Sequence, residues 1–190
     1  MSPGGMNAGG GSLERIETPR LVCERLGPKH RDEIARLVLD PRVARWIEAD
    51  GRPAPEREVS SWLIAKDEHW ARHGFGQWLI RDRLTGEMVG RGGLQHTHVG
   101  GREEVEVGWA IVPEHWGQGL ATEMALAALE LAFGSLGLAD VVAFTLPDNI
   151  ASRGVMEKTG FVFERELEHA GRPHVLYRHR GPVGRPDAGR

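Results

Sequence analysis

Cysteine and long hydrophobic runs are nearly absent from this 190-residue sequence. The one cysteine, Cys23, has no partner for an internal disulfide, as is usual in a reducing compartment. No hydrophobic run approaches the length of a membrane span. The first twelve residues, MSPGGMNAGGGS, lack the basic-then-apolar order of a signal peptide. We therefore expect a cytoplasmic protein that does not enter a membrane.

An excess of one charge is also missing. The chain has 24 Lys and Arg against 27 Asp and Glu, for a formal net charge of −3. Without a basic field, direct nucleic-acid binding is not expected. The composition, 40% hydrophobic and 27% charged, is ordinary for a globular domain. The length predicts one domain at 13–180, between flexible Gly- and Pro-rich tails at 1–12 and 181–190.

The hydrophobic periodicity predicts a mixed α/β protein. Extended, β-branched runs predict strands at 18–26, 77–82, 87–98, 103–112, 140–146, 162–169 and 174–180. Helical spacing predicts helices at 28–40, 55–74, 120–134 and 149–158, with a further short helix at 40–48. Gly74 and Gly160 are expected to end helices, Gly160 in a left-handed cap.

The stretch HWGQGLAT, at 115–122, places two glycines where a strand hands over to an alanine-rich helix. Glycine at such a point provides positive φ or lets a ligand approach the backbone. The exposed amides at a helix N-terminus then form an anion site. This stretch therefore raises the question of which anion is bound.

Two known phosphate motifs fit the stretch poorly. A P-loop needs Lys and then Ser or Thr after its last glycine, but Leu120 and Ala121 follow Gly119. A Rossmann fingerprint wants Gly or Ala where Thr122 stands, and an acid at the end of the next strand. Two interpretations remain: a metal-free cradle for a cofactor pyrophosphate, made by the amides of 117–122, or a tight turn without a ligand.

The strand before the turn carries an acid beside two minimal side chains. Alternation puts Val105, Val107, Trp109 and Ile111 on one face, and Glu106, Gly108 and Ala110 on the other. Small residues beside Glu106 predict an open hollow that contains its carboxylate. The alternative is an acid on a solvated face.

Together these stretches resemble the GNAT family of acetyl-CoA-dependent N-acetyltransferases, and within it the Rim-type branch that acetylates protein N-terminal amines. The resemblance rests on EVGWAIVPEHWGQGLATE and TLPDNIASRGVMEKTGF and covers about Thr18 to Tyr177. It implies a mixed, mostly antiparallel, splayed sheet of about seven strands flanked by about four helices. Trp116 stands where many members have Gln or Arg, which removes a side-chain contact but leaves the backbone cradle.

The second motif departs from the commoner family pattern. Aligned on Asn149, the position of a tyrosine acid is Met156, which cannot donate a proton. The resemblance to the Rim-type branch instead assigns Ser152 to the leaving thiolate. Asn149 and Ser152 also suit the cap and first turn of a helix, which is the alternative interpretation.

The resemblance implies transfer of acetyl from acetyl-CoA to a primary amine by direct attack. Glu106 is the expected base and Ser152 assists the thiolate. Pantetheine would pair with the strand edge at Ile111 and Val112, with a backbone N–H near Val112 as the oxyanion donor. The expected coenzyme A contacts are Ile111, Val112, Gly117, Gln118, Gly119, Leu120, Ala121, Thr122, Asn149, Ser152 and Arg153.

The acceptor is expected to be a protein N-terminal amine. A small-molecule amine and a catalytically silent acyl-CoA-binding module are the alternatives. A homodimer is left open. The pairs His69/His73 and His96/His98 lack a third ligand, so no metal is expected. Trp46, Trp62 and Trp70 lie in the early helices, where the resemblance places the acceptor pocket, although core packing is the default.

Overall fold

A computed structural model describes residues 13–182 of the chain. Its strands are β1 Arg15–Glu17, β2 Leu21–Arg25, β3 Gln77–Asp82, β4 Met88–Val99, β5 Arg102–Ile111, β6 Asp140–Thr145, β7 Val162–His169 and β8 Arg172–Arg180. They form one sheet in the order β1-β2-β3-β4-β5-β6-β8-β7. Every pair is antiparallel except β5 with β6. The predicted mixed, mostly antiparallel sheet is confirmed.

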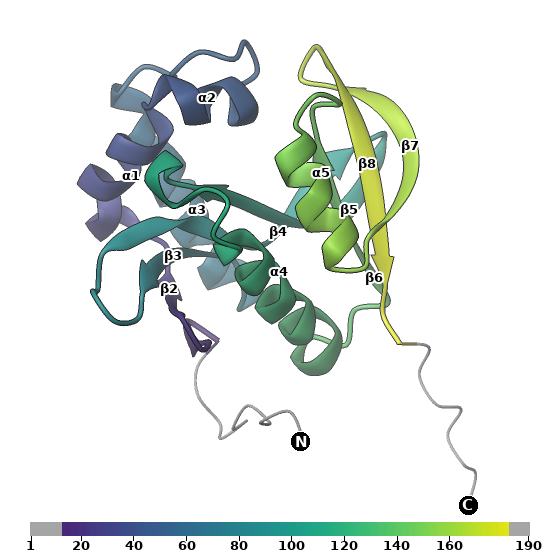
Figure 1. Cartoon of the computed structure of the whole chain (residues 1–190), viewed down its shortest axis with the longest axis horizontal. Coiled ribbons are helices and arrows are strands. Elements are labelled where there is room, and N and C mark those ends of the chain that lie inside the picture. Colours follow the sequence, from purple (N-terminus) through teal and green to yellow (C-terminus); the bar gives the residue numbers. More distant parts are fainter. Residues whose placement is uncertain (1–12, 183–190) are drawn as a thin grey trace, which may run out of the picture.

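The sheet opens between its two halves. β5 and β6 pair only at Glu106 and Val142, so the part of β5 that leads to Ile111 has no strand beside it on that edge. In Figure 1, β2 and β3 with α1 to α3 lie to the left, β6 to β8 with α5 lie to the right, and β4 and α4 lie between them. The splay expected after about residue 109 is thus present from residue 107 onward.

Five α-helices accompany the sheet: α1 Arg31–Val38, α2 Pro41–Ile47, α3 Arg57–His73, α4 Leu120–Glu130 and α5 Ile150–Lys158. Gly74 ends α3 as predicted, with φ 73°, and Gly160 follows α5 with φ 89°, in the left-handed conformation predicted for it. α4 runs on into a π-helical turn at Leu131–Ser135. The four predicted helices and the further short helix predicted at 40–48, which is α2, are all present.

The eighth strand is β1, which the sequence prediction missed. Its three residues pair with β2 from Arg15↔Glu24 to Glu17↔Val22. Three residues are too few for a period of two to be recognised. The predicted domain limits of 13–180 stay a prediction, and residues 1–12 and 183–190 of the expected tails lie outside the described residues.

The two faces of β5 belong to different hydrophobic clusters. Val107 and Ile111 pack with α4 residues such as Met124. Ala110 packs on the opposite face with Leu63 of α3 and with residues of α1. The predicted alternation along this strand is confirmed, and it points Glu106, which shares the parity of Ala110, toward α1 to α3.

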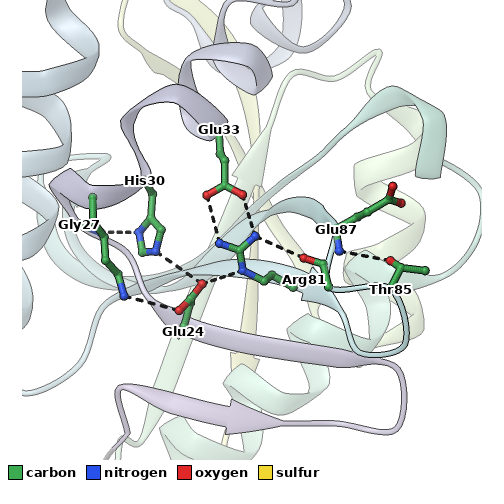
Figure 2. A network of polar contacts seen from close by, with 9 residues as sticks. Glu24, Gly27, His30, Glu33, Arg81, Thr85 and Glu87 are labelled. Atoms are coloured by element: carbon green, nitrogen blue, oxygen red, sulfur yellow. Dashed lines mark hydrogen bonds and ion pairs between the residues drawn. The ribbon is translucent and has the colours of Figure 1, made fainter.

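A partly buried ion cluster ties α1 to β2 and β3. Figure 2 shows the Arg81 guanidinium between two carboxylates, with Nε 2.8 Å from Glu24 Oε1 and Nη1 2.7 Å from Glu33 Oε1. Burial acts to raise the pKa of Glu24, but the hydrogen bond and charge of Arg81 outweigh it and lower this pKa. The hydrogen bond from Arg81 likewise lowers the pKa of Glu33. The cluster therefore links the helical layer to the sheet.

We expect Arg81→Met to lower the free energy of unfolding by about 1–3 kcal/mol, because two half-buried carboxylates lose their countercharge. Urea denaturation at neutral pH measures this. Lowered folded-state pKa values mean that the stabilisation is present above the ordinary carboxyl pKa and is lost as pH falls through the lowered values. The difference in the free energy of unfolding between the wild type and Arg81→Met should then shrink on acidification. Arg15→Met, which removes an exposed pair with Glu17, is the control and should cost under about 0.5 kcal/mol. Equal losses in both variants would contradict the assignment.

Candidate active site

A cavity of about 890 Å³ lies where the sheet opens. Residues from both faces of β5 line it, Glu106 and Gly108 on one and Trp109 and Ile111 on the other. A single cavity touches both faces because β5 and β6 separate beyond Glu106. Its size is typical of a small-molecule site. The cavity thus runs through the sheet, from the α4 side to the side of α1 to α3.

The glycine turn forms the end of the cavity next to α4. Gly117 and Gly119 have φ of 75° and 78°, so positive φ, one of the two explanations that the sequence offers for these glycines, is present. Gly119 is the N-cap of α4, and the first helical bond runs from Glu123 N to Gly119 O at 3.1 Å. The preceding N–H groups have no acceptor within the helix, as an anion site requires. The turn residues that line the cavity are Gly117, Gly119, Leu120, Ala121 and Thr122.

Arg20 holds this turn in place, and sequence reasoning missed it. Its Nη1 donates to Gln118 O at 2.8 Å, and its Nε donates to Glu123 Oε2 at 2.6 Å. Gln118 therefore contacts Arg20 through its backbone carbonyl, and it does not line the cavity. Burial acts to raise the pKa of Glu123, but hydrogen bonds from Thr18 and Arg20 lower it. An acid in the first turn of a helix that binds an anion needs such a countercharge, which is the signal that could have revealed Arg20.

The free edge of β5 differs from the expectation at one residue. The Val112 N–H donates to Val89 O at 2.9 Å, so it faces β4 and is already used. Val112 is also not among the lining residues. Because backbone groups alternate along an antiparallel strand, the N–H groups of Trp109 and Ile111 face the opening. The expected oxyanion donor, a backbone N–H near Val112, stays a prediction, and the neighbouring N–H of Ile111 is the one that faces the opening.

Glu106 lies in the cavity with its carboxylate held on one side. Gln95 Nε2 donates to Glu106 Oε2 at 2.7 Å. A Cβ on Gly108 would come within 3.0 Å of Glu106 Oε1, so the glycine leaves the space that the carboxylate occupies. Burial raises the pKa of Glu106, opposed by the Gln95 hydrogen bond and by the charges of Lys66 and Arg91. A carboxylate with a raised pKa is a stronger base than an exposed one.

A chain of polar side chains continues from Glu106 toward α3, and no pattern in the sequence indicates it. Gln95 Oε1 accepts from Lys66 Nζ and, at 3.2 Å, from Gln77 Nε2. Gln77 Oε1 in turn accepts from Arg91 Nη1 at 3.0 Å. Burial, and then the charge of Arg91, lower the pKa of Lys66 to about 8. The pairing of β3, β4 and β5 and the packing of α3 against them bring these residues together.

The start of α5 forms the wall opposite β5. Asn149 Oδ1 accepts from Ser152 N at 3.2 Å, so the predicted helix cap is present, and both residues line the cavity. Met156, at the position of the missing tyrosine, is buried and also lines it. Arg153 does not, because its guanidinium donates to the Tyr177 hydroxyl at 3.2 Å and to a backbone carbonyl. The lining cation on this helix is Lys158.

The aromatic residues of the early helices divide between site and core. Trp46 and Trp62 line the cavity, whereas Trp70 is buried and donates to Gln77 O at 2.7 Å. Cys23 is buried in β2, and burial raises the pKa of its thiol to about 12. Its thiol therefore stays protonated, in agreement with a core residue rather than a nucleophile. The histidine rings of α3 lie near His96, but both ring nitrogens of His69 have hydrogen-bond partners.

Neither a metal site nor a membrane span is found in the described part of the chain. Within residues 13–182, no three His, Cys, Asp or Glu side chains are grouped as metal ligands. No helix in this range is long and apolar enough to cross a bilayer.

Comparisons with known proteins agree with this geometry. Residues 20–162 match the family model of the acetyltransferase (GNAT) domain. The chain is 35% identical over 154 residues to the FsC-acetyl coenzyme A-N(2)-transacetylase of Aspergillus fumigatus, a match that covers 76% of this chain and 63% of that relative, less than two thirds of its length.

Two solved structures show the same fold. A putative GnaT-family acetyltransferase from Bordetella pertussis superimposes with a TM-score of 0.75 at 28% identity, over 86% of this chain and 98% of that one. RimL, a ribosomal L7/L12 α-N-protein acetyltransferase in complex with coenzyme A, gives 0.72 at 18% identity, over 88% and 98%. The chain belongs to the GNAT acetyltransferase family and is an acetyl-CoA-dependent acyltransferase.

Proposed function

We propose that this protein acetylates a primary amine, with Glu106 as the base that frees the amine's lone pair. The observation that carries the proposal is the position of Glu106. Its carboxylate, with a raised pKa, lies in the same cavity as the amides of the glycine turn. A base and an anion site that share one cavity suit a reaction between an amine and a cofactor thioester.

The proposed reaction uses the groups described above. The coenzyme A phosphates bind the amides of 117–122, and Asn149 and Ser152 contact the cofactor from α5. Glu106 takes a proton from the ammonium, directly or through a water, and the amine nitrogen attacks the thioester carbon. The Ile111 N–H stabilises the oxyanion. The carbon–sulfur bond then breaks, the Ser152 hydroxyl hydrogen-bonds to the departing thiolate, and the extra proton on the former amine nitrogen passes to that thiolate, which leaves an amide and a thiol.

The acceptor predicted from the Rim-type resemblance is a protein N-terminal amine. The alternative, a small-molecule amine, is supported by the relative whose name gives acetylation at N(2). Labelled acetyl-CoA offered to N-terminal peptides and to small amines separates the two. A thermal shift with coenzyme A but no turnover of any amine would instead indicate a silent binding module. A homodimer stays a prediction, which light scattering tests.

Ser152→Ala should lower kcat by about tenfold, near 1.4 kcal/mol, because its hydrogen bond matters most as the thiolate forms. The KM for acetyl-CoA should change less. Saturation kinetics measure both constants under conditions in which chemistry limits the rate. Ser61→Ala removes an exposed hydroxyl on α3 that bonds to Glu58 O and is the matched control. An undiminished kcat in Ser152→Ala would mean that Ser152 is only a first-turn residue of α5.

A further inference from the structure

Two cationic side chains meet at the wall of the cavity beside α3 without a carboxylate between them. Lys66 and Arg91 both line the cavity, and each charged group lies 5.0 Å from the centre of the Trp62 ring. Their hydrogen bonds go to the neutral amides of Gln95 and Gln77. The buried Nε of Arg91 has no hydrogen-bond partner. Within residues 13–182, neither cation forms an ion pair.

Other arginines with little exposure in this chain are treated differently. Arg81 pairs with two carboxylates, and Arg178, whose side chain is 13% exposed, pairs with three: Glu104, Asp140 and Glu164. Leaving a buried charge without a countercharge costs several kcal/mol. Amides and one tryptophan ring offset only part of that cost. In the described part of the chain, the wall at Arg91 therefore lacks a carboxylate at ion-pair distance such as Arg81 and Arg178 have, and only the charges of Glu106 and Glu48, farther away in the same cavity, act on it.

The strand register places Lys66 and Arg91 on the side of the sheet away from the glycine turn. The β4 residues Arg91, Gly93 and Gln95 lie opposite Ala110, Gly108 and Glu106 of β5. This face packs against α1 to α3, whereas α4, which begins at the turn, packs on the other. The Cα atoms of Arg91 and Gln95 are about 13 Å apart along the strand. Between them lie Gly93 and Gly108, of which Gly108 lines the cavity together with Arg91, Gln95 and Glu106, so the cations and the base share one wall.

From this arrangement we infer that the acceptor is an amine that carries a carboxylate. The amine lies at Glu106, and the carboxylate binds Arg91 and Lys66 beside Trp62. The inference rests on the proposed function and adds the charge of the acceptor to it. The same chemistry occurs in a free amino acid and in a peptide with an acidic side chain near its N-terminus. Arg91 supplies a directional guanidinium donor and Lys66 a point charge, which together suit a carboxylate.

A rival explanation assigns the cations to Glu106 alone. Both charges act to lower the Glu106 pKa, so they could serve only to keep that base ionised. In that case, loss of Arg91 would affect every amine equally, with or without a carboxylate. The two explanations therefore differ in selectivity between matched acceptors.

The experiment compares acceptors that differ only in the anion. One arm uses free amino acids and their C-terminal amides. The other uses the peptide amides Ser-Asp-Ala and Ser-Asn-Ala. Each is assayed with saturating acetyl-CoA for the wild type, Arg91→Met, Arg91→Lys, Lys66→Met and the exposed α3 control Arg72→Met. We expect the wild type to prefer the carboxylated member at least tenfold in kcat/KM in one arm, which identifies the source of the carboxylate. Arg91→Met should reduce the preference to near one, Arg91→Lys should restore part of it, and Arg72→Met should keep it.

An equal kcat/KM for both members of each pair in the wild type would overturn the inference. An equal loss of kcat/KM for both members in Arg91→Met would also overturn it. In either case, turnover itself would uphold the proposed function. Thermal shift of the coenzyme A-saturated protein with the same probes provides a readout without catalysis. Stabilisation by the carboxylated probes that Arg91→Met or Lys66→Met abolishes would support the inference. If no amine is acetylated, the proposed function fails while this result stands. If no amine is acetylated and no carboxylated probe stabilises the protein, the inference is overturned as well.

Discussion

Glu106→Gln is expected to lower kcat by roughly 10²–10⁴-fold, the usual share of a general base. The amide can still bond to Gln95, but it cannot take a proton from the ammonium. Coenzyme A affinity should barely change, because the amides of the glycine turn are untouched. Steady-state kinetics with saturating acetyl-CoA and calorimetric titration with coenzyme A measure the two quantities.

The pH dependence separates two roles for Glu106. Burial raises its pKa, so wild-type activity should rise with pH through a pKa above the ordinary glutamate range. In Glu106→Gln this rise of activity with pH should vanish. Activity should then recover only at high pH, where more of the amine is neutral without a base to remove its proton. Glu103→Gln, an exposed change on the same strand, is the control. A higher acceptor KM with kcat intact would mean that Glu106 only attracts a cationic acceptor.

Gly119→Val is expected to weaken coenzyme A binding by at least tenfold, or about 1.4 kcal/mol. Gly119 has φ 78° at the N-cap of α4, a conformation that a β-branched residue adopts only with strain. A valine side chain would also project from the backbone that is to contact phosphate. Calorimetric titration with coenzyme A measures the affinity, and circular dichroism checks that the fold is kept.

Gly137→Val is the matched control for that strain. Gly137 has φ 62° with open space around it. It lies just after the π-helical turn and does not line the cavity. It should lose stability in the same way but keep its affinity for coenzyme A. An unchanged affinity in folded Gly119→Val would refute the backbone cradle.

The local features of the site could be predicted from the sequence. Positive φ at Gly117 and Gly119, the cap at Asn149 and the ends of α3 and α5 depend on residues adjacent in the chain, which limit the backbone directly. The alternation along β5 that sends Glu106 and Ala110 to one face follows from strand geometry alone. The acid, the turn and the family resemblance can therefore be recognised in the order of the amino acids.

Contacts between distant segments needed the tertiary structure. The side of β5 that the Val112 N–H faces depends on its register with β4, and a shift of one residue reverses it. The guanidinium of Arg153 meets Tyr177, and Arg20 reaches Glu123, because the sheet brings separate parts of the chain together. Lys66, Arg91 and Gln95 come from α3 and β4, and no spacing in the sequence sets their distance to Glu106. The amino-acid order thus suffices for the fold class and the backbone of the glycine turn, since these follow from local conformation. The side chains that line the cavity around Glu106 are brought together only by the pairing of strands and the packing of α3 on them.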